Sequence, residues 1–420
     1  MKIAVIGGGL AGLCAAWLLS PRHRVTLLER HARPGFVASS VAVDGSAGAP
    51  RVDVPLRVFY PGYYPTLVRL YQALGVASEP VSYAATFCGA DGRAYFRWRI
   101  LGMGAQAWPY VLPQDLLTSR ARRIAAGALA FRGLARLALA RDELNGLSLG
   151  DFVTRHGLAP AFVDGLLLPT WATIATCTHA DALAYPAAVV AGYLAAGVAH
   201  QSVRRAVLGA DEVAARLVAG ITRVQCGAEV QALRADDCGV QVRQADGQDE
   251  AFDHVVLATQ AHQALALWQG APPAEAAALA AFRHRALEVV MHRDAALMPR
   301  QRGDWSAVNA RVLPGLDSPE ATIWVNAVQP GLRDAADVFQ TVQPQREPRA
   351  DRVISRARFE RPLVDAASQR ALATLQRLRA KPGRRVWLCG SYAEAGVPLL
   401  ESAVRSAHAV AAAIDAAAGL

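Results

Sequence analysis

A glycine-rich segment near the start of the chain limits the folds that this sequence can adopt. Residues 2–6 (KIAVI) form a short apolar run, typical of a strand that is buried on both faces. Residues 7–12 (GGGLAG) follow at once and match the pattern G-x-G-x-x-G. An apolar helix is predicted over 13–20 and a second strand over 24–28, which Glu29 closes. This order of elements predicts a dinucleotide-binding βαβ unit.

Each glycine of the pattern has a physical task. Gly7 permits the tight turn, Gly9 lets the backbone approach a pyrophosphate, and Gly12 lets the helix pack closely on the strand. For such a pattern taken alone, a glycine-rich turn that binds nothing is the alternative. The strand, helix and second strand in the correct order favour dinucleotide binding.

The residues that flank the glycines complete the predicted cofactor contacts. The backbone N–H groups of Leu10 and Ala11, at the positive end of the helix dipole, are expected to face the phosphates. Glu29 is expected to accept hydrogen bonds from the adenosine ribose hydroxyls. Its carboxylate would repel the 2′-phosphate of NADP, so FAD and NAD are both favoured over NADP.

Length and composition predict a compact protein of two domains. The chain has 420 residues, of which 53% are hydrophobic and 19% are charged, so it can bury a large core. The formal net charge is +9, but the arginines are spread along the chain and no groove-reading motif is present. We therefore expect no nucleic-acid partner.

The cysteines and the N-terminus indicate the compartment. The six cysteines lie far apart without metal-ligand spacing, so neither a metal site nor a disulfide framework is predicted. Three consecutive glycines interrupt the apolar N-terminal stretch, which argues against a signal peptide. A cytoplasmic location is expected.

The segment after the second strand resembles a known flavoprotein superfamily. Residues 29–35 (ERHARPG) are similar to the segment that follows the fingerprint in the flavin-containing amine oxidase and phytoene desaturase superfamily. The resemblance implies that the cofactor is FAD, bound non-covalently, and that Arg30 and Arg33 contact it. Phe36 stands where the superfamily carries a second glycine.

A second block of similarity covers residues 52–76, which include the letters YPTL and LGV. In the superfamily this block passes beside the flavin ring, so the resemblance places Leu56 and Arg57 there. Arg57 could hold a substrate carboxylate or a flavin anion, and a surface salt bridge is the alternative. Pro55 replaces the usual glycine.

A third block lies near the C-terminus. Residues 386–390 (VWLCG) and 401–406 (ESAVRS) resemble the C-terminal flavin-binding strand and helix. The resemblance implies that Gly390 contacts the cofactor and that Leu400 and Glu401 open the helix near the flavin. The dipole of that helix would favour negative charge at N1 and O2 of the reduced flavin.

Further positions follow from the same resemblance. Val230 is expected to pack its backbone against the adenine, and Tyr392 joins Arg57 as a candidate catalytic residue. Ser391 replaces an acidic residue that is common in the superfamily. The stretch 296–300 (ALMPR) is most similar to a bacterial branch of predicted NAD/FAD-binding proteins.

The expected fold class is α/β, with a Rossmann-type FAD-binding domain of the glutathione-reductase type and an interleaved α+β substrate domain. The FAD domain is predicted to comprise residues 1–75, 205–265 and 380–420, and the substrate domain residues 76–204 and 266–379. Residues 228–235, 239–246 and 253–259 are predicted to form a three-stranded meander.

The resemblance implies an FAD-dependent oxidoreductase, because the flavin takes hydride from a substrate C–H bond. Many amine oxidases of the superfamily keep a lysine near flavin N5, but Lys2 and Lys381 are the only lysines here and neither position suits that role. An apolar or lipid-like small molecule that undergoes carbon–carbon desaturation or oxidation is therefore favoured. A redox-neutral FAD-dependent double-bond isomerase is one alternative. A flavoprotein that has lost catalysis and acts as a binding partner is another.

A predicted helix within 114–141 suggests a further partner. Apolar residues recur on one side of it and arginines on the other; they are Ile124, Ala128, Phe131, Ala135 and Ala138 against Arg122, Arg132 and Arg136. The pattern fits a weak peripheral membrane contact, and it also fits an ordinary surface helix.

Several other side chains of the substrate domain are candidates for the wall of a pocket. Four of them could line a pocket or belong to the core, namely Trp171, Tyr185, Trp324 and Asn326. No role is assigned to His179, His262 or His292.

Overall fold

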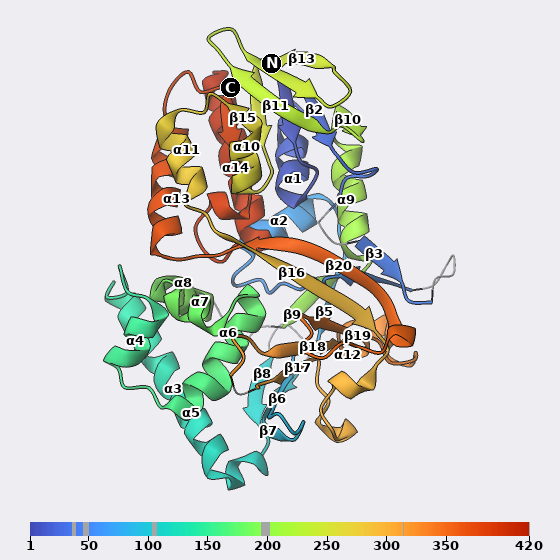
Figure 1. Cartoon of the computed structure of the whole chain (residues 1–420), viewed down its shortest axis with the longest axis vertical. Helices are drawn as coiled ribbons and strands as arrows, with labels where there is room; N and C mark the ends of the chain where they lie inside the picture. The colour runs from blue at the N-terminus through green and yellow to red at the C-terminus, as the bar shows by residue number, and fades with distance from the viewer. Residues whose placement is uncertain (36–38, 45–49, 103–106, 195–201, 314, 420) are drawn as a thin grey trace.

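A parallel sheet of five strands forms one main part of the fold. The computed structural model describes residues 1–35, 39–44, 50–102, 107–194, 202–313 and 315–419. The strands lie in the spatial order β10-β2-β1-β14-β21 (Figure 1). They are β1 (Lys2–Ile6), β2 (Arg24–Glu29), β10 (Arg223–Cys226), β14 (His254–Leu257) and β21 (Val386–Leu388). The two central strands, β1 and β14, are buried on both faces, which explains their unbroken apolar sequences.

Helices cover one face of this sheet at close range. α1 (Leu10–Leu19) follows β1, and α14 (Leu400–Ala417) packs along α1. A Cβ atom at Gly12 would overlap the carbonyl oxygen of Gly7, so only glycine permits this approach of α1 to the end of β1. Two more helices pack on this pair, α2 (Pro65–Ala73) on α14 and α9 (Gly209–Ala219) on α1.

The opposite face carries a second, smaller sheet and three helices. The sheet has the order β13-β12-β11-β15, with β11 (Val230–Ala235), β12 (Val240–Gln244), β13 (Asp249–Phe252) and β15 (Trp268–Gln269). The helices are α10 (Ala261–Leu267), α11 (Pro273–Ala280) and α13 (Ala366–Arg379). Leu233 and Phe252 share one buried apolar cluster with Ile6 and Leu257 of the parallel sheet.

The structure corrects the third strand of the predicted meander. The first two predicted strands are present as β11 and β12, but residues 254–257 form β14, which pairs in parallel with β1 and β21. The third strand of the meander is β13, which pairs with β12. The run of Val255, Val256 and Leu257 is apolar on both faces and therefore suits a central parallel strand rather than a half-exposed edge.

A long, mostly antiparallel sheet forms the other main part of the fold. Figure 1 shows its two longest strands, β16 and β20, crossing the middle of the molecule below the parallel sheet. In spatial order the strands are β20 (Val353–Pro362), β16 (His284–His292), β19 (Phe339–Val342), β18 (Glu320–Trp324), β17 (Val308–Arg311), β6 (Ala85–Cys88), β7 (Ala94–Leu101) and β8 (Trp108–Val111). α12 (Val325–Val328) follows β18. Two small ribbons pair β3 (Ser39–Ala42) with β4 (Arg51–Val54), and β5 (Ser78–Val81) with β9 (Val203–Ala206).

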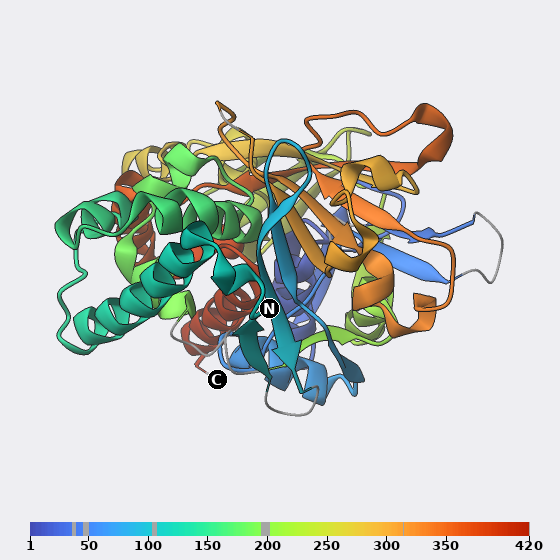
Figure 2. The same cartoon turned by 90° about the horizontal axis from the view of Figure 1, so that it is seen from below.

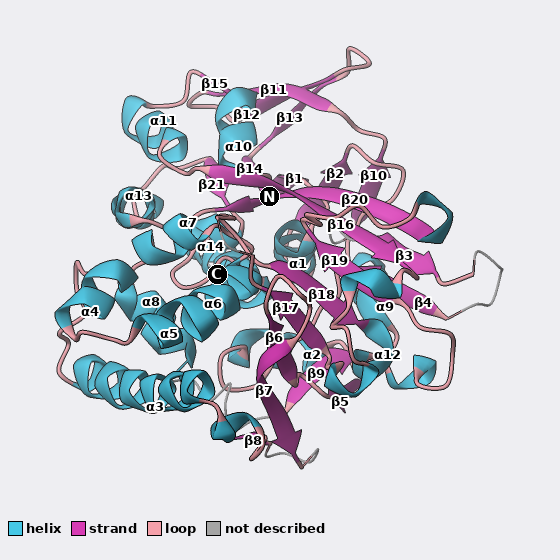
Figure 3. Cartoon of the chain, turned by 60° about the horizontal axis from the view of Figure 1, so that its bottom comes forward, coloured by secondary structure: helices cyan, strands magenta, loops and turns pink. Residues whose placement is uncertain are grey.

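A helical layer lies beside this sheet, as Figures 2 and 3 show. It contains α3 (Ser119–Ala140), α4 (Leu149–Arg155), α5 (Pro160–Phe162), α6 (Leu168–Ala175), α7 (His179–Ala184) and α8 (Ala187–Tyr193). Ile124 and Phe131 of α3 are buried, whereas the predicted arginines are exposed, so the predicted two-sided helix is confirmed. Within the described residues, no helix combines the length and apolar character needed to cross a bilayer.

The domain boundaries stay a prediction. The packing of two helices, α11 and α13, concerns where one of these boundaries lies. α11 and α13 lie within residues 266–379, which were assigned to the substrate domain. Leu279 of α11 and Leu372 of α13 nevertheless belong to the same buried cluster as Ile6 and Leu257 of the parallel sheet. These two helices thus share the core of the FAD-side sheet.

Two glycines of α3 provide a matched test of this packing. A Cβ atom at Gly127 would overlap Phe162, whereas one at Gly133 would meet nothing within 4 Å. We expect Gly133→Ala to raise the free energy of unfolding by about 0.5–1 kcal/mol, because alanine favours a helix interior over glycine. Gly127→Ala is expected to lower it by about 1–3 kcal/mol through overpacking. Urea unfolding of both variants measures this, and equal effects of the two would contradict the packing of α3 on α5.

Candidate functional site

The glycine loop leaves the start of α1 open to a large cavity. Gly7 has a positive φ of 107°, which favours glycine, and its N–H donates to the carbonyl oxygen of Leu28 at 2.9 Å. Gly9 is the N-cap of α1, no side chain caps this helix, and a Cβ atom at Gly9 would meet nothing within 4 Å. Leu10 and Ala11 also line the cavity. An uncapped helix N-terminus that faces a cavity is suited to binding a phosphate.

Gly12 does not line the cavity, and its contact with Gly7 is a packing contact, as the sequence predicts for the third glycine. Glu29, Arg30 and Arg33 lie on the cavity wall near the loop. The Glu29 carboxylate accepts hydrogen bonds from the N–H of Gly8 at 2.6 Å and of His31 at 2.8 Å. A carboxylate has about four acceptor sites, so it retains capacity for ribose hydroxyls. Phe36 lies outside the described residues.

A second uncapped helix N-terminus faces the same cavity. Leu399 is the N-cap of α14, which no side chain caps, and Leu399, Leu400 and Ala403 line the cavity. The N–H of Gly390 donates to Ser406 Oγ at 2.9 Å, which fixes the turn after β21 against α14. Gly390 also lines the cavity, as does Val230 of β11.

The side chain of Glu401 does not line the cavity, contrary to its expected place at the cofactor. Its carboxylate is buried and accepts hydrogen bonds from the N–H of Thr66 at 3.1 Å and of Leu67 at 2.9 Å. These are first-turn amides of α2, so Glu401 caps α2. The resemblance placed the backbone of residue 401 correctly at the start of α14 but could not give the direction of its side chain.

The cavity is large enough for a dinucleotide and a separate substrate. Its volume is about 1940 Å³, whereas pockets for drug-sized ligands span roughly 300–1,000 Å³. Beyond the glycine loop it becomes an apolar chamber between the long sheet and the helical layer. The walls of this chamber include Phe87, Phe96, Trp98, Phe131, Leu166, Leu167, Ile174, Val308 and Ile323.

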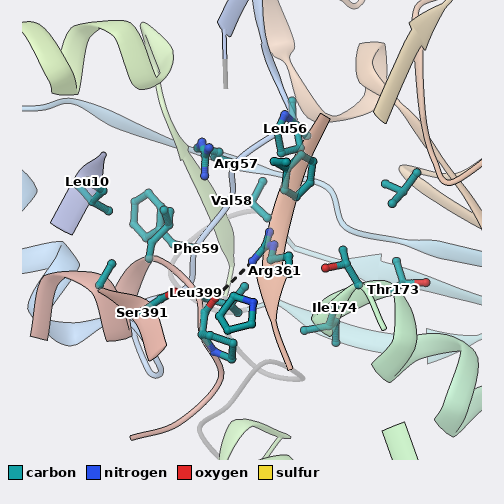
Figure 4. A pocket seen from close by; sticks show the side chains of 18 of the residues that line it. Leu10, Leu56, Arg57, Val58, Phe59, Thr173, Ile174, Arg361, Ser391 and Leu399 are labelled. Carbon is teal, nitrogen blue, oxygen red and sulfur yellow. Dashed lines mark hydrogen bonds between the residues drawn. The ribbon is translucent and has the colours of Figure 1, made fainter. Parts of the chain in front are cut away.

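Leu56 and Arg57 both line the cavity and are labelled on its wall in Figure 4. The Leu56 N–H donates to Gln340 Oε1 at 2.9 Å, which holds this segment on β19. Burial lowers the pKa of Arg57 to about 10, partly offset by the charge of Asp53. Arg57 is thus a buried residue of the cavity wall rather than a surface residue.

Arg361 is a cavity residue that the sequence did not point out. It stands at the end of β20, and Figure 4 shows it on the cavity wall close to Leu399. Its Nη1 donates to the carbonyl oxygen of Pro398 at 3.4 Å. Nothing local distinguishes this arginine from the many others in the sequence, because only the pairing of β20 with β16 brings it to the cavity.

Two tyrosines of the cavity wall were also missed. Tyr60 and Tyr193 pack edge to face with ring centroids 5.5 Å apart, and the Tyr60 hydroxyl donates to the carbonyl oxygen of Tyr193 at 2.9 Å. Burial raises the pKa of both phenols. They act as neutral, rigid walls.

Tyr392, a candidate catalytic residue, lies outside the cavity. It is buried against Phe282, with ring centroids 5.1 Å apart, and belongs to the core cluster under β21. Its hydroxyl has no hydrogen-bond partner among the described residues. The adjacent Ser391 does line the cavity. The chain turns at Gly390, so the two neighbours point in different directions, and Tyr392 is not placed for catalysis.

The other pocket candidates belong to the core. Trp171 and Tyr185 are buried with ring centroids 5.2 Å apart, and neither lines the cavity. Asn326 binds the backbone of the segment 332–338, and Trp324 Nε1 donates to Asp337. These four residues are structural, which is one of the two alternatives that the sequence left open.

Of the three histidines, only His262 lines the cavity. Its Nε2 lies 3.3 Å from Glu360. His179 sits at the start of α7, where burial lowers its pKa. His292 is fully buried, and its Nε2 lies 2.8 Å from Thr341 Oγ1.

This architecture recurs in flavoenzymes of known structure. Residues 5–74 match the family of NAD(P)-binding Rossmann-like domains. A double mutant of putrescine oxidase has a TM-score of 0.68 to this chain at 15% identity, with 99% of each chain covered. For cyclohexylamine oxidase from Brevibacterium oxydans IH-35A the TM-score is 0.67 at 15% identity, with 100% of this chain and 99% of that chain covered.

A third similar structure is the CLA-producing fatty acid isomerase from P. acnes, with a TM-score of 0.65 at 15% identity and 96% of each chain covered. No curated protein matches the sequence. The chain has the fold of the flavin amine oxidase superfamily, which confirms the fold class expected from its motifs.

His292 provides a pH test of the sheet that lines the chamber. Burial lowers the pKa of His292 to about 4, whereas an unfolded histidine titrates near pH 6.5. Between these values the unfolded chain binds a proton that the folded chain does not. Stability is therefore expected to fall by up to about 3 kcal/mol as the pH drops from about 6.5 to about 4. The loss should be smaller in His292→Gln and unchanged in a His31→Gln control, measured by urea unfolding; equal losses in all three proteins would contradict it.

Proposed function

We propose that this chain is an FAD-dependent oxidoreductase that abstracts hydride from an apolar or lipid-like small molecule, leading to carbon–carbon desaturation or oxidation. The observation that carries the proposal is one cavity that joins two uncapped helix N-termini to an apolar chamber. The first helix start suits a pyrophosphate, and the second suits the negative charge of a reduced flavin. FAD, when bound, supplies the hydride acceptor.

The residues of the chain would position the substrate and exclude water. The amides at the start of α1 would hold the phosphates, and Glu29 and Val230 the adenosine end. The apolar chamber would orient a hydrocarbon group beside Leu56 and Arg57. Lys2 pairs with Glu250 at the start of β1 and Lys381 is exposed in a turn, so neither lines the cavity. This supports carbon–carbon chemistry over amine oxidation.

The isomerase alternative keeps support from one comparison. A fatty acid isomerase shares the fold, and the apolar chamber fits an unsaturated chain equally well. A redox-neutral enzyme would return the hydride to the same molecule, so product would form without net bleaching of the flavin. A binding protein that has lost catalysis would show neither product nor bleaching.

A first experiment tests the cofactor and the reaction together. The purified protein should show the absorbance bands of oxidised flavin, and anaerobic mixing with long-chain alkenes and fatty acids should bleach them, whereas amines should not. Gly9→Val should lower the affinity for FAD at least about tenfold, because the added side chain would occupy the phosphate site. Gly303→Ala, which meets nothing within 4 Å, is the control. A wild-type protein that cannot take up FAD would overturn the proposal.

We also propose that an anionic lipid surface is a partner at the mouth of the chamber. Leu117, just before α3, is 79% exposed and Leu129 of α3 is 70% exposed. Leu129 borders the cavity together with Arg132 and Arg136. α3 carries five arginines and no acidic residue, which favours an anionic surface. A cytoplasmic location is retained as part of this proposal.

Vesicle sedimentation tests this contact. The protein should sediment with vesicles of phosphatidylcholine and phosphatidylglycerol and much less with phosphatidylcholine alone, because the arginines attract anionic headgroups. Leu117→Ser with Leu129→Ser should weaken binding about tenfold or more. Leu316→Ser, an exposed leucine elsewhere, should not. Equal binding of all variants, or of both vesicle types, would contradict the proposal.

A further inference from the structure

Among the described residues, Arg361 has no acidic partner, unlike the other arginines of its strand. On β20, Arg356 and Arg358 both pair with Glu288, at 2.9 and 3.1 Å. Side chains alternate between the two faces of a strand, so Arg361 lies on the face of β20 opposite to Arg356 and Arg358. On that face its Nη1 donates a hydrogen bond to the carbonyl oxygen of Pro398 at 3.4 Å. Burial lowers the pKa of Arg361, and the groups that oppose this shift are the phenols of Tyr64 and Tyr185 rather than a carboxylate.

Positive charge accumulates around Arg361. Arg285 is its direct cross-strand partner in the pairing of β16 with β20, and like charges in such positions repel. The charge of Arg361 also contributes to the lowered pKa of Arg57. Buried cations are normally paired, because removing a charge from water is costly. An anion in the cavity would offset this repulsion.

A second polar group in the same neighbourhood lacks a partner. The hydroxyl of Tyr185 is buried and has no hydrogen-bond partner within the described structure. Arg361 acts on the pKa of this phenol as well, so the two groups are neighbours. Tyr185 does not line the cavity, so Arg361 is the one of these two groups that a ligand in the cavity can reach.

We propose that Arg361 forms an anion-binding subsite in the cavity wall close to Leu399, which takes the carboxylate of an otherwise apolar substrate. A planar guanidinium binds a carboxylate through two parallel hydrogen bonds. The phosphate end of the cavity lies elsewhere, at the glycine loop with Arg30 and Arg33. The substrate class is therefore an amphiphilic carboxylic acid with a hydrocarbon chain. This inference rests on the proposed function and names the substrate of the same site.

The test compares two probes with the same chain and different head groups. Decanoate and 1-decanol are titrated into the FAD-loaded protein by calorimetry, which needs no turnover. The wild type should bind decanoate at least about tenfold more tightly than decanol. Arg361→Gln should remove this preference and Arg361→Lys should keep part of it. Arg356→Gln, on the same strand but paired with Glu288 and not part of the cavity wall, is the matched control and should keep all of it.

Three outcomes would overturn the subsite. The first is equal affinity of the wild type for decanoate and decanol. This comparison needs only the wild type, so it can be made even if Arg361→Gln does not fold. The second is full decanoate preference in Arg361→Gln. The third is loss of FAD from Arg361→Gln with decanoate affinity unchanged, which would assign the arginine to the flavin. If decanoate binds as expected but no substrate bleaches the flavin, the subsite stands and the oxidoreductase proposal fails.

Discussion

The close approach of Gly12 to the carbonyl oxygen of Gly7 lets α1 begin directly at the end of β1, and the geometry of the whole site depends on it. In a parallel sheet, helices that follow their strands begin at the same edge. α1 begins after β1, and α14 begins after β21 with Ser406 bound to Gly390. Both helix N-termini therefore reach one cavity. A wider spacing of α1 would direct its amides away from that cavity.

Two different environments meet in this cavity because two different sheets supply its walls. The parallel sheet ends in backbone amides and in the charged side chains of Glu29, Arg30 and Arg33. The long sheet presents alternate side chains to the chamber, and along β17 and β18 these are apolar, such as Val308 and Ile323. A molecule that is polar at one end and apolar at the other matches this division.

The parts of the site that depend on neighbouring residues could be predicted from the sequence. The glycine loop, Glu29 and the start of α14 are local features, since each is defined by the residues directly before and after it in the sequence. Side-chain direction could not be predicted in this way. Glu401 turns to the amides of α2, and Tyr392 turns into the core beside Phe282. Arg361 was missed because its place depends on a pairing between strands about 70 residues apart in the chain.

The order of the strands in the chain has a consequence for biosynthesis. The parallel sheet takes its central strands from residues 2–6 and 254–257, but the edge strand β21 and the helix α14 come from residues after 385. A growing chain can form the glycine loop early, yet the second helix N-terminus of the cavity is made last. The binding energy of the cofactor becomes fully available only after the residues of β21 and α14 have been synthesised.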